Sequence, residues 1–228
     1  MKCIYCGVRK ATTSDHVPPR SIFAKPRPSN LVTVPSCSKC NKGASQDDEY
    51  FKYVISMSDA TGDNLQARQA RDSSMRSLKR REAAGYRRAI LEKTRPVQVR
   101  SPQGIFLGTK LGYEVRFDRL FKVLERTVKG LFFFEAGYPL SIDYRPLIHS
   151  SDTIADLNFD VQGEMQRNII NPLWNRDPKE IGSDTFQYRF QFFEEDPHVS
   201  AWGLTFFSSI EFVALTGPAK LRGGLNEP

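Results

Sequence analysis

The sequence contains no apolar run close to the roughly 20 residues that a membrane-spanning helix needs,. Its first ten residues, MKCIYCGVRK, lack the apolar stretch of a secretory signal peptide,. No internal repeat and no long low-complexity tract interrupts the chain. These absences predict a soluble, cytoplasmic protein with no membrane partner. With 228 residues, of which 39% are hydrophobic, the chain is long enough for one large domain or two small ones around a real core,.

Cysteine is scarce, and the four cysteines all fall within the first 40 residues as two CxxC pairs, Cys3 with Cys6 and Cys37 with Cys40. In a reducing cytosol this pattern favours a metal site over disulfides. Two such pairs complete a tetrahedral shell of four thiolates, which suits Zn²⁺. A site of that kind is structural because it has no open position for chemistry. The alternative is that one or both pairs are redox-active or ordinary buried thiols.

Positive charge is unevenly distributed along the chain. Residues 1–95 contain 19 Lys or Arg against 9 Asp or Glu, whereas residues 96–228 contain 14 against 17. The net charges of the two parts are therefore +10 and −3. A positive field favours a polyanion, so the N-terminal part is expected to contact nucleic acid.

Composition divides the chain into three stretches and predicts an α+β fold. Residues 1–58 are rich in Cys, Pro and Ser and are expected to form a small zinc-bound domain. Residues 59–95 have ten Lys or Arg and sparse apolar residues, as in a basic helical connector,. Residues 96–228 are predicted to form a separate α+β domain with a mainly antiparallel sheet.

Hydrophobic periodicity places the individual elements. Helices are expected over 47–58 and 117–137, and the second has Phe117, Leu120, Phe121, Leu124, Val128 and Leu131 on one core-facing stripe,. Period-two alternation or β-rich composition predicts strands at 10–17, 30–35, 104–110, 113–117, 186–195 and 202–215,.

The text around the cysteines resembles a known family. The matching segments are CIYCG, DHVPPRSIF and NLVTVPSCSKCNKG. Together they are similar to the HNH endonucleases of ββα-metal fold, in the version whose zinc knot has two CxxC pairs. In that family a strand ends in Asp-His, an Asn precedes the second strand, and Cys-x-x-Cys-Asn opens a helix. The resemblance covers residues 1–55.

The resemblance implies a role for four side chains. His16 is expected to be the general base, Asp15 a ligand of the catalytic ion, and Asn41 the second ligand of that ion. Asn30 matches the middle Asn, whose side chain supports the loop and orients the histidine. Many members have His at the third position, and here Asn41 stands there instead. The implied cofactors are structural Zn²⁺ and catalytic Mg²⁺ or Mn²⁺.

The residue types suit phosphodiester hydrolysis by themselves. A neutral imidazole with a pKa near 6.5 can take a proton from water at neutral pH. One carboxylate and one amide, completed by water and phosphate oxygens, are typical ligands of Mg²⁺. Successive side chains on a strand point to opposite faces, so Asp15 and His16 can face one site only at a strand end or bulge. Alternatively, the pair is a hydrogen-bonded turn, Asn30 starts a strand, and Asn41 caps a helix.

Seven cations surround the motif and are expected to neutralise phosphates, which sets affinity more than sequence preference. They are Arg9, Lys10, Arg20, Lys25, Arg27, Lys39 and Lys42. The run SLKRREAAGYRR, residues 77–88, is either a helix that tracks the nucleic-acid backbone or a solvated linker helix.

The sequence thus predicts a metal-dependent HNH endonuclease that hydrolyses DNA to 5′-phosphate and 3′-hydroxyl ends, by analogy in bacterial or phage defence or restriction. The alternatives are a non-enzymatic zinc-knot protein that binds nucleic acid, and an RNase or toxin-like effector acting on RNA. Residues 96–228 are expected to select the target, bind a partner, regulate the nuclease or form a homodimer.

Overall fold

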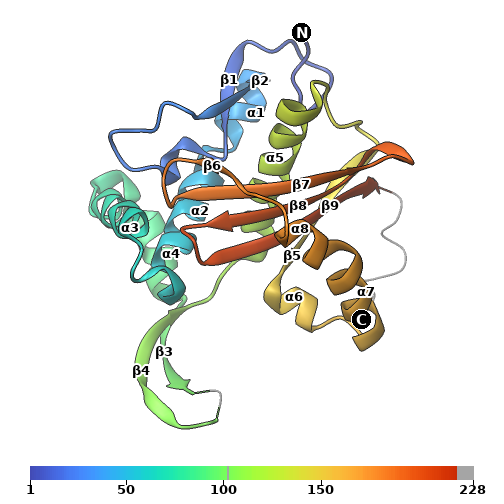
Figure 1. The fold of residues 1–228 in the computed structure, drawn as a ribbon. Helices are drawn as coiled ribbons and strands as arrows, with labels where there is room; N and C mark the ends of the chain where they lie inside the picture. Colours follow the sequence, from blue (N-terminus) through green and yellow to red (C-terminus); the bar gives the residue numbers. More distant parts are fainter. Residues whose placement is uncertain (102, 220–228) are drawn as a thin grey trace.

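A computed structural model of the chain describes residues 1–101 and 103–219. Figure 1 shows an α+β architecture in which three antiparallel β-structures are joined by helices, and this confirms the predicted fold class. No helix in the described part of the chain has both the length and the apolar character to cross a bilayer. The strands of the two smaller structures are β1 (Thr13–Val17), β2 (Val32–Ser36), β3 (Thr94–Arg100) and β4 (Phe106–Tyr113).

The first 58 residues, called the cysteine module below, form a β-hairpin followed by helices. β1 pairs with β2 in regular antiparallel register, with Asp15 opposite Val34 and His16 opposite Thr33. Between the strands lies the short 3₁₀ helix η1 (Arg20–Ile22). After β2 come α1 (Ser38–Gly43) and α2 (Ser45–Met57). The predicted strands and the helix over 47–58 are therefore confirmed.

The basic connector is helical, as expected, but it is broken. It contains η2 (Asp59–Thr61), α3 (Leu65–Leu78), η3 (Arg81–Ala83) and α4 (Ala84–Glu92). Asn64 caps α3, since its side chain accepts a hydrogen bond from the backbone N–H of Ala67 at 2.9 Å,. Ala67 and Ala70 are buried in the main hydrophobic core, so α3 packs against the chain's own body.

The ribbon of β3 and β4 projects from the rest of the molecule (Figure 1). β4 confirms the strand predicted over 104–110. The strand predicted over 113–117 is wrong, because β4 ends at Tyr113 and α5 begins at Phe117. The backbone N–H of Arg116 donates to the Tyr50 hydroxyl at 2.8 Å, and this bond anchors the corner between them.

Helix α5 (Phe117–Ala136) is the central helix, and its apolar stripe is largely as predicted. Leu120, Leu124, Val128 and Leu131 are buried, whereas Phe117 lies on the first turn and is 46% exposed. Gly130 lets α5 approach β1 closely, since a Cβ there would lie 2.4 Å from a methyl group of Val17. The N-terminal hairpin therefore packs directly on this helix.

The predicted antiparallel sheet is confirmed, and it has five strands in the order β5–β9–β8–β7–β6. The segment predicted as strand over 202–215 spans parts of two strands, because a turn at residues 207–209 separates β8 from β9. Its strands are β5 (Tyr144–Ser150), β6 (Lys179–Ile181), β7 (Phe186–Phe193), β8 (Asp196–Phe206) and β9 (Ile210–Pro218). Between β5 and β6 lie α6 (Ser151–Ala155), α7 (Phe159–Met165), a π-helical turn (Gln166–Ile170) and α8 (Asn171–Trp174).

One hydrophobic core links the cysteine module to the sheet. The same buried cluster contains Ile22 and Phe51 from the module, Leu124 from α5, and Trp202 and Phe206 from β8. The ring of Phe51 meets that of Phe206 edge-on, with centroids 5.1 Å apart. The division into three domains at residues 58 and 95 stays a prediction, while the packing of the described residues is continuous across both positions.

Candidate functional site

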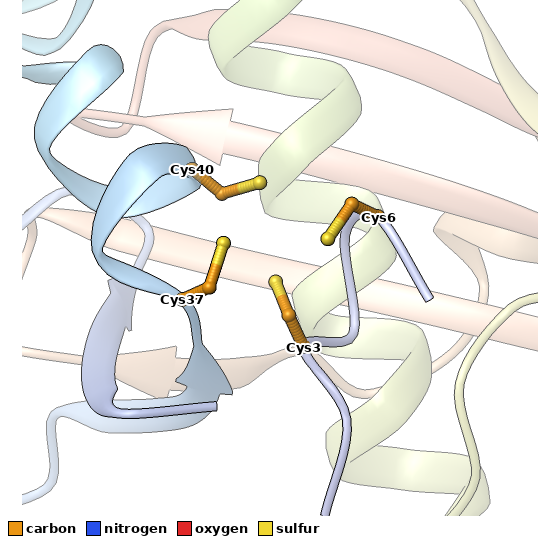
Figure 2. A group of neighbouring side chains, drawn as sticks. All are labelled: Cys3, Cys6, Cys37 and Cys40. Carbon is orange, nitrogen blue, oxygen red and sulfur yellow. The ribbon is translucent and has the colours of Figure 1, made fainter. Parts of the chain in front are cut away.

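The four cysteines lie together, as Figure 2 shows. Cys3 and Cys6 lie on the loop before β1, while Cys37 and Cys40 lie at and just inside the start of α1. Their four Sγ atoms are all within 4.8 Å of one another. Sulfur atoms around a tetrahedral Zn²⁺ with bonds of 2.3 Å are about 3.8 Å apart, so a small adjustment closes the shell. The cluster can hold a metal ion such as zinc.

The surroundings of the cluster favour the thiolate form at some sulfurs and oppose it at another, since burial raises the pKa of the Cys40 thiol to about 12,. The backbone N–H of Cys40 donates to Cys37, and this bond is the main reason why the pKa of the Cys37 thiol falls to about 6,. The guanidinium of Arg9 also hydrogen-bonds the Cys37 sulfur. Arg9 therefore lies beside the sulfur cluster, where it balances negative charge.

Two residues on opposite faces of β1 define the candidate site. Asp15 is buried, with 7% of its surface exposed, and faces the helices, whereas His16 is half-buried on the other face. The alternation follows from the regular pairing of β1 with β2, which has no bulge at these positions,. The strand end or bulge that would turn both side chains to one side is therefore absent at Asp15 and His16.

The His16 imidazole forms no hydrogen bond with any described residue. Burial and the nearby cations Arg20 and Arg27 lower its pKa from 6.5, while Asp15 opposes the shift, and burial has the largest effect,. The ring is therefore neutral at pH 7 and has a nitrogen that can accept a proton.

The Asp15 carboxylate is held by two partners that sequence reasoning did not identify. Its Oδ2 accepts a hydrogen bond from the Tyr5 hydroxyl at 2.8 Å and forms an ion pair with Arg126 of α5. Arg126 also pairs with Asp48 of α2 at 2.9 Å, and its guanidinium lies over the Tyr5 ring. Among the described residues, Oδ1 of Asp15 accepts no hydrogen bond.

Asn41 lies against β1 from the helix side. Its amide nitrogen donates to the Ser14 carbonyl oxygen at 3.0 Å and to the Thr13 hydroxyl at 3.2 Å. Thr13 shares a strand face with Asp15, so the Asn41 amide and the Asp15 carboxylate lie on the same side of β1,. The amide oxygen of Asn41 forms no hydrogen bond with the described residues, so this face offers a carboxylate oxygen and an amide oxygen, both uncommitted.

The side chain of Asn30 forms its hydrogen bonds with the β6 region and not with His16. Its amide nitrogen donates to the Glu180 carbonyl oxygen at 3.0 Å, and its Oδ1 accepts a 3.4 Å bond from the Gly182 backbone N–H. Asn30 thus ties the loop before β2 to the β6–β7 turn and makes no hydrogen bond to His16.

The seven predicted phosphate-binding cations are all exposed, namely Arg9, Lys10, Arg20, Lys25, Arg27, Lys39 and Lys42. The two acids that could replace Asn41 near an ion have other contacts. Asp48 pairs with Arg126, and Glu49 pairs with Lys52 at 2.7 Å. Within the described residues, no further group of three His, Cys, Asp or Glu side chains lies close enough to share an ion.

Arg126 is the residue of the candidate site that sequence reasoning missed. One signal was present, since Arg119 and Arg126 are seven residues apart and share a face of α5. Arg119 pairs with Asp47 at 2.6 Å and Arg126 with Asp48, so the two helices are joined by paired charges. Comparison with protein-family models, with curated proteins and with solved structures yields no match.

Proposed function

We propose that this chain is a metal-dependent endonuclease of the HNH type that hydrolyses DNA. The observation that carries the proposal is the half-exposed His16 imidazole of β1, which forms no hydrogen bond within the part of the chain that the structure describes. This strand belongs to a hairpin next to the four-cysteine cluster and α1, and α1 contributes Asn41. Zinc is the metal proposed for the cluster, in a purely structural role.

His16 acts as the general base in this proposal. Its neutral nitrogen takes a proton from the water that attacks phosphorus, and the 3′ oxygen leaves. The exposed guanidinium groups of Arg20 and Arg27, which also lower the pKa of His16, are close enough to hold the phosphate by charge,. The products are a 5′-phosphate and a 3′-hydroxyl end.

Asp15 Oδ1 and Asn41 Oδ1 are the proposed ligands of a catalytic Mg²⁺ or Mn²⁺. They lie on the face of β1 opposite His16, so the proposal requires the phosphate to reach both faces around the end of the strand at Val17. They fit in donor type, because a carboxylate and an amide oxygen are hard ligands that leave room for water and phosphate. Such an ion, when bound, stabilises negative charge on the phosphate and the leaving oxygen. Arg126 holds the other Asp15 oxygen and fixes the carboxylate in place.

A second function is favoured by a specific observation. Asp15 is ion-paired to Arg126, and His16 lies on the opposite strand face, which suits a zinc-knot module that binds nucleic acid without cutting it. The basic surface would then be the functional part, and Asp15 would be structural.

Plasmid cleavage separates the two functions. Supercoiled DNA is incubated with Mg²⁺ or Mn²⁺ and the wild type or His16→Ala, with His149→Ala as the matched control, and RNA is tested in parallel. The enzyme predicts ion-dependent cutting that falls at least 100-fold in His16→Ala only, at unchanged melting temperature. Retained DNA binding without cutting by the wild type would instead establish the binding module, and cutting of RNA alone would identify an RNase.

A further inference from the structure

The β3–β4 ribbon is a largely exposed two-stranded structure. It projects from the body (Figure 1), and most of its side chains are exposed on both faces. An isolated two-stranded ribbon is marginally stable in water, and surface of this kind is usually maintained for a partner. The two strands extend about 25 Å from their base, at roughly 3.3 Å per residue.

The charge of the ribbon is of one sign. β3 and β4 contain Arg95, Arg100 and Lys110 and no acidic residue. Arg95 pairs with Glu114 at 3.3 Å and Lys110 with Asp59 at 2.8 Å, but all four side chains are at least 55% exposed. Exposed pairs of this kind are weak and exchange readily for a phosphate partner. Arg100 pairs with no acid among the described residues.

The ribbon continues a larger basic unit. Residues 64–113, which span α3, α4 and the ribbon, contain twelve Lys or Arg and three Asp or Glu, a net charge of +9. The whole chain has a net charge of +7, so the remaining residues together are slightly acidic. The positive field of the protein is therefore produced by this unit, and it points to a polyanionic partner.

Apolar side chains cluster at the distal end of the ribbon. Ile105, Phe106 and Leu107 are 63, 53 and 65% exposed, and Phe106 and Leu107 are the first two residues of β4. Arg100 lies opposite Phe106 in the register. Proteins that hold duplex DNA with a strand or arm often insert apolar side chains of these types between base steps, beside cations on the phosphates.

The unit is connected to the candidate nuclease site along one side of the molecule. η1, which begins at Arg20, contacts α3, α3 contacts α4, and α4 runs into β3. Figure 1 shows α3 and α4 between the β1–β2 hairpin and the ribbon. Along this path Arg68, Arg76, Arg80, Arg81 and Arg88 are exposed, and none of them pairs with an acid among the described residues.

From these observations we infer that the β3–β4 ribbon is a DNA-binding arm, which grips a duplex through Arg95, Arg100 and Lys110 and wedges it with Phe106 and Leu107. The inference rests on the proposed function in naming DNA as the partner, and it adds a second contact distant from His16. A ribbon of two strands fits the major groove, about 12 Å wide, or lies along the minor groove.

The charge of the arm is tested by binding to a fluorescent 30-base-pair duplex at several salt concentrations. The buffer has no added divalent ion, which prevents cutting, and no chelator, which would strip the cysteine cluster. The triple variant Arg95→Gln, Arg100→Gln, Lys110→Gln is compared with Lys122→Gln, Arg167→Gln, Arg176→Gln, which removes three exposed cations elsewhere. The arm variant is expected to lower the slope of log K against log salt by about 2 to 3 and to bind at least tenfold more weakly. Equal affinity to the wild type, or an equal loss in the control, overturns the inference.

The wedge is tested by end-to-end fluorescence transfer on the same duplex. The double variant Phe106→Ser, Leu107→Ser is expected to abolish the DNA bend that the wild type induces, while the dependence of log K on log salt stays unchanged.

The competing occupant of the apolar tip is a second copy of this chain, because exposed apolar side chains there could pack on another molecule. A wild-type dimer that Phe106→Ser dissociates without any change in DNA binding or bending would overturn the inference. Binding without cleavage would refute the proposed nuclease and leave the arm intact.

Discussion

The cysteine module and the five-stranded sheet are stabilised by different interactions, although they share one hydrophobic core. The sheet is built on aromatic packing: Phe186, Trp202 and Phe206 are fully buried, and the Phe190 ring stacks on Trp202 with centroids 5.2 Å apart. The module instead contains four clustered thiols and two carboxylates that share the half-buried guanidinium of Arg126 from α5. A buried polar network is stable only when each polar group has its hydrogen-bond or ion-pair partner. Replacing one side chain at a time therefore measures how much each contributes to the stability of the module.

The difference also separates structure from candidate chemistry. The two histidines of the five-stranded sheet, His149 of β5 and His198 of β8, belong to the packing. Burial lowers the pKa of His149. The His198 ring lies among the rings of Phe132, Tyr138 and Tyr144. His16 has neither a hydrogen bond nor a ring contact with the described residues. His149 likewise forms no side-chain hydrogen bond with the described residues, so His16 is distinguished by its place in the cysteine module beside the exposed cations Arg20 and Arg27.

Removing a thiol should have the largest effect. Cys37→Ser is expected to abolish stoichiometric zinc binding and to unfold the module, because the binding free energy of a structural zinc is also folding free energy. Zinc content by mass spectrometry and melting by calorimetry measure both losses. Trp202→Ala, which should cost about 3 to 5 kcal/mol in the sheet, is the control and should retain its zinc. Unchanged stability in Cys37→Ser would show that the cysteines hold no structural metal.

Removing the Arg126 guanidinium, which Asp15 and Asp48 share, should have the second-largest effect on stability. Arg126→Met leaves the buried Asp15 carboxylate and the half-buried Asp48 carboxylate without a cation, which should lower the free energy of unfolding by about 3 kcal/mol,. The control Arg116→Met removes an exposed pair with Asp118 and should cost at most about 1 kcal/mol,. Chemical denaturation of both variants measures the difference, and equal losses would mean that the buried pairs have no special weight.

Asp48 should make stability depend on pH in an unusual direction. Burial, opposed by Arg126, raises the pKa of Asp48 from 3.8 to about 6 in the folded protein. The folded state therefore holds this proton more tightly than the unfolded chain does. The resulting stabilisation is fully present below about pH 4 and is lost as the pH rises through 6, on the order of 3 kcal/mol.

The pH effect is measured as the difference between wild type and Asp48→Asn in urea unfolding from pH 4 to 7. The wild type should lose stability relative to the variant across this range. A difference that is constant with pH, or one of opposite sign, would show that Arg126 outweighs burial and keeps Asp48 ionised.

Asn30 offers the smallest and most selective test. The side-chain amide of Asn30 forms hydrogen bonds with β6 and with the β6–β7 turn. Asn30→Ala should therefore lower the free energy of unfolding by about 1 kcal/mol and leave any cleavage rate within about twofold of the wild-type rate. The family resemblance predicts a large loss of rate instead, because the matching Asn orients the histidine. The cleavage rate is measured under single-turnover conditions for Asn30→Ala and for the control Asn64→Ala. The control removes a side chain that caps α3 and hydrogen-bonds the Asp184 carbonyl oxygen, so comparing the two rates distinguishes the two roles.

The outcome of sequence reasoning depended on how far apart the interacting residues were. CxxC spacing and the stripe on α5 are local patterns, and they predicted the cysteine cluster and the central helix. Arg126 meets Asp15 across 111 residues and Asn30 meets Glu180 across 150, and no local pattern encodes such pairs. The error at 113–117 has the same origin, since the alternation continued into the first residue of α5 while Tyr50, from a distant helix, fixes the corner.

The most direct test of the nuclease account is a crystal grown with Mn²⁺, with anomalous scattering recorded at the manganese and zinc edges. The account predicts a zinc peak among the four Sγ atoms and a separate manganese peak bound to Oδ1 of Asp15 and Oδ1 of Asn41. A zinc peak alone, with no manganese at those two oxygens although the same protein sample binds DNA in solution, would contradict catalysis at this site.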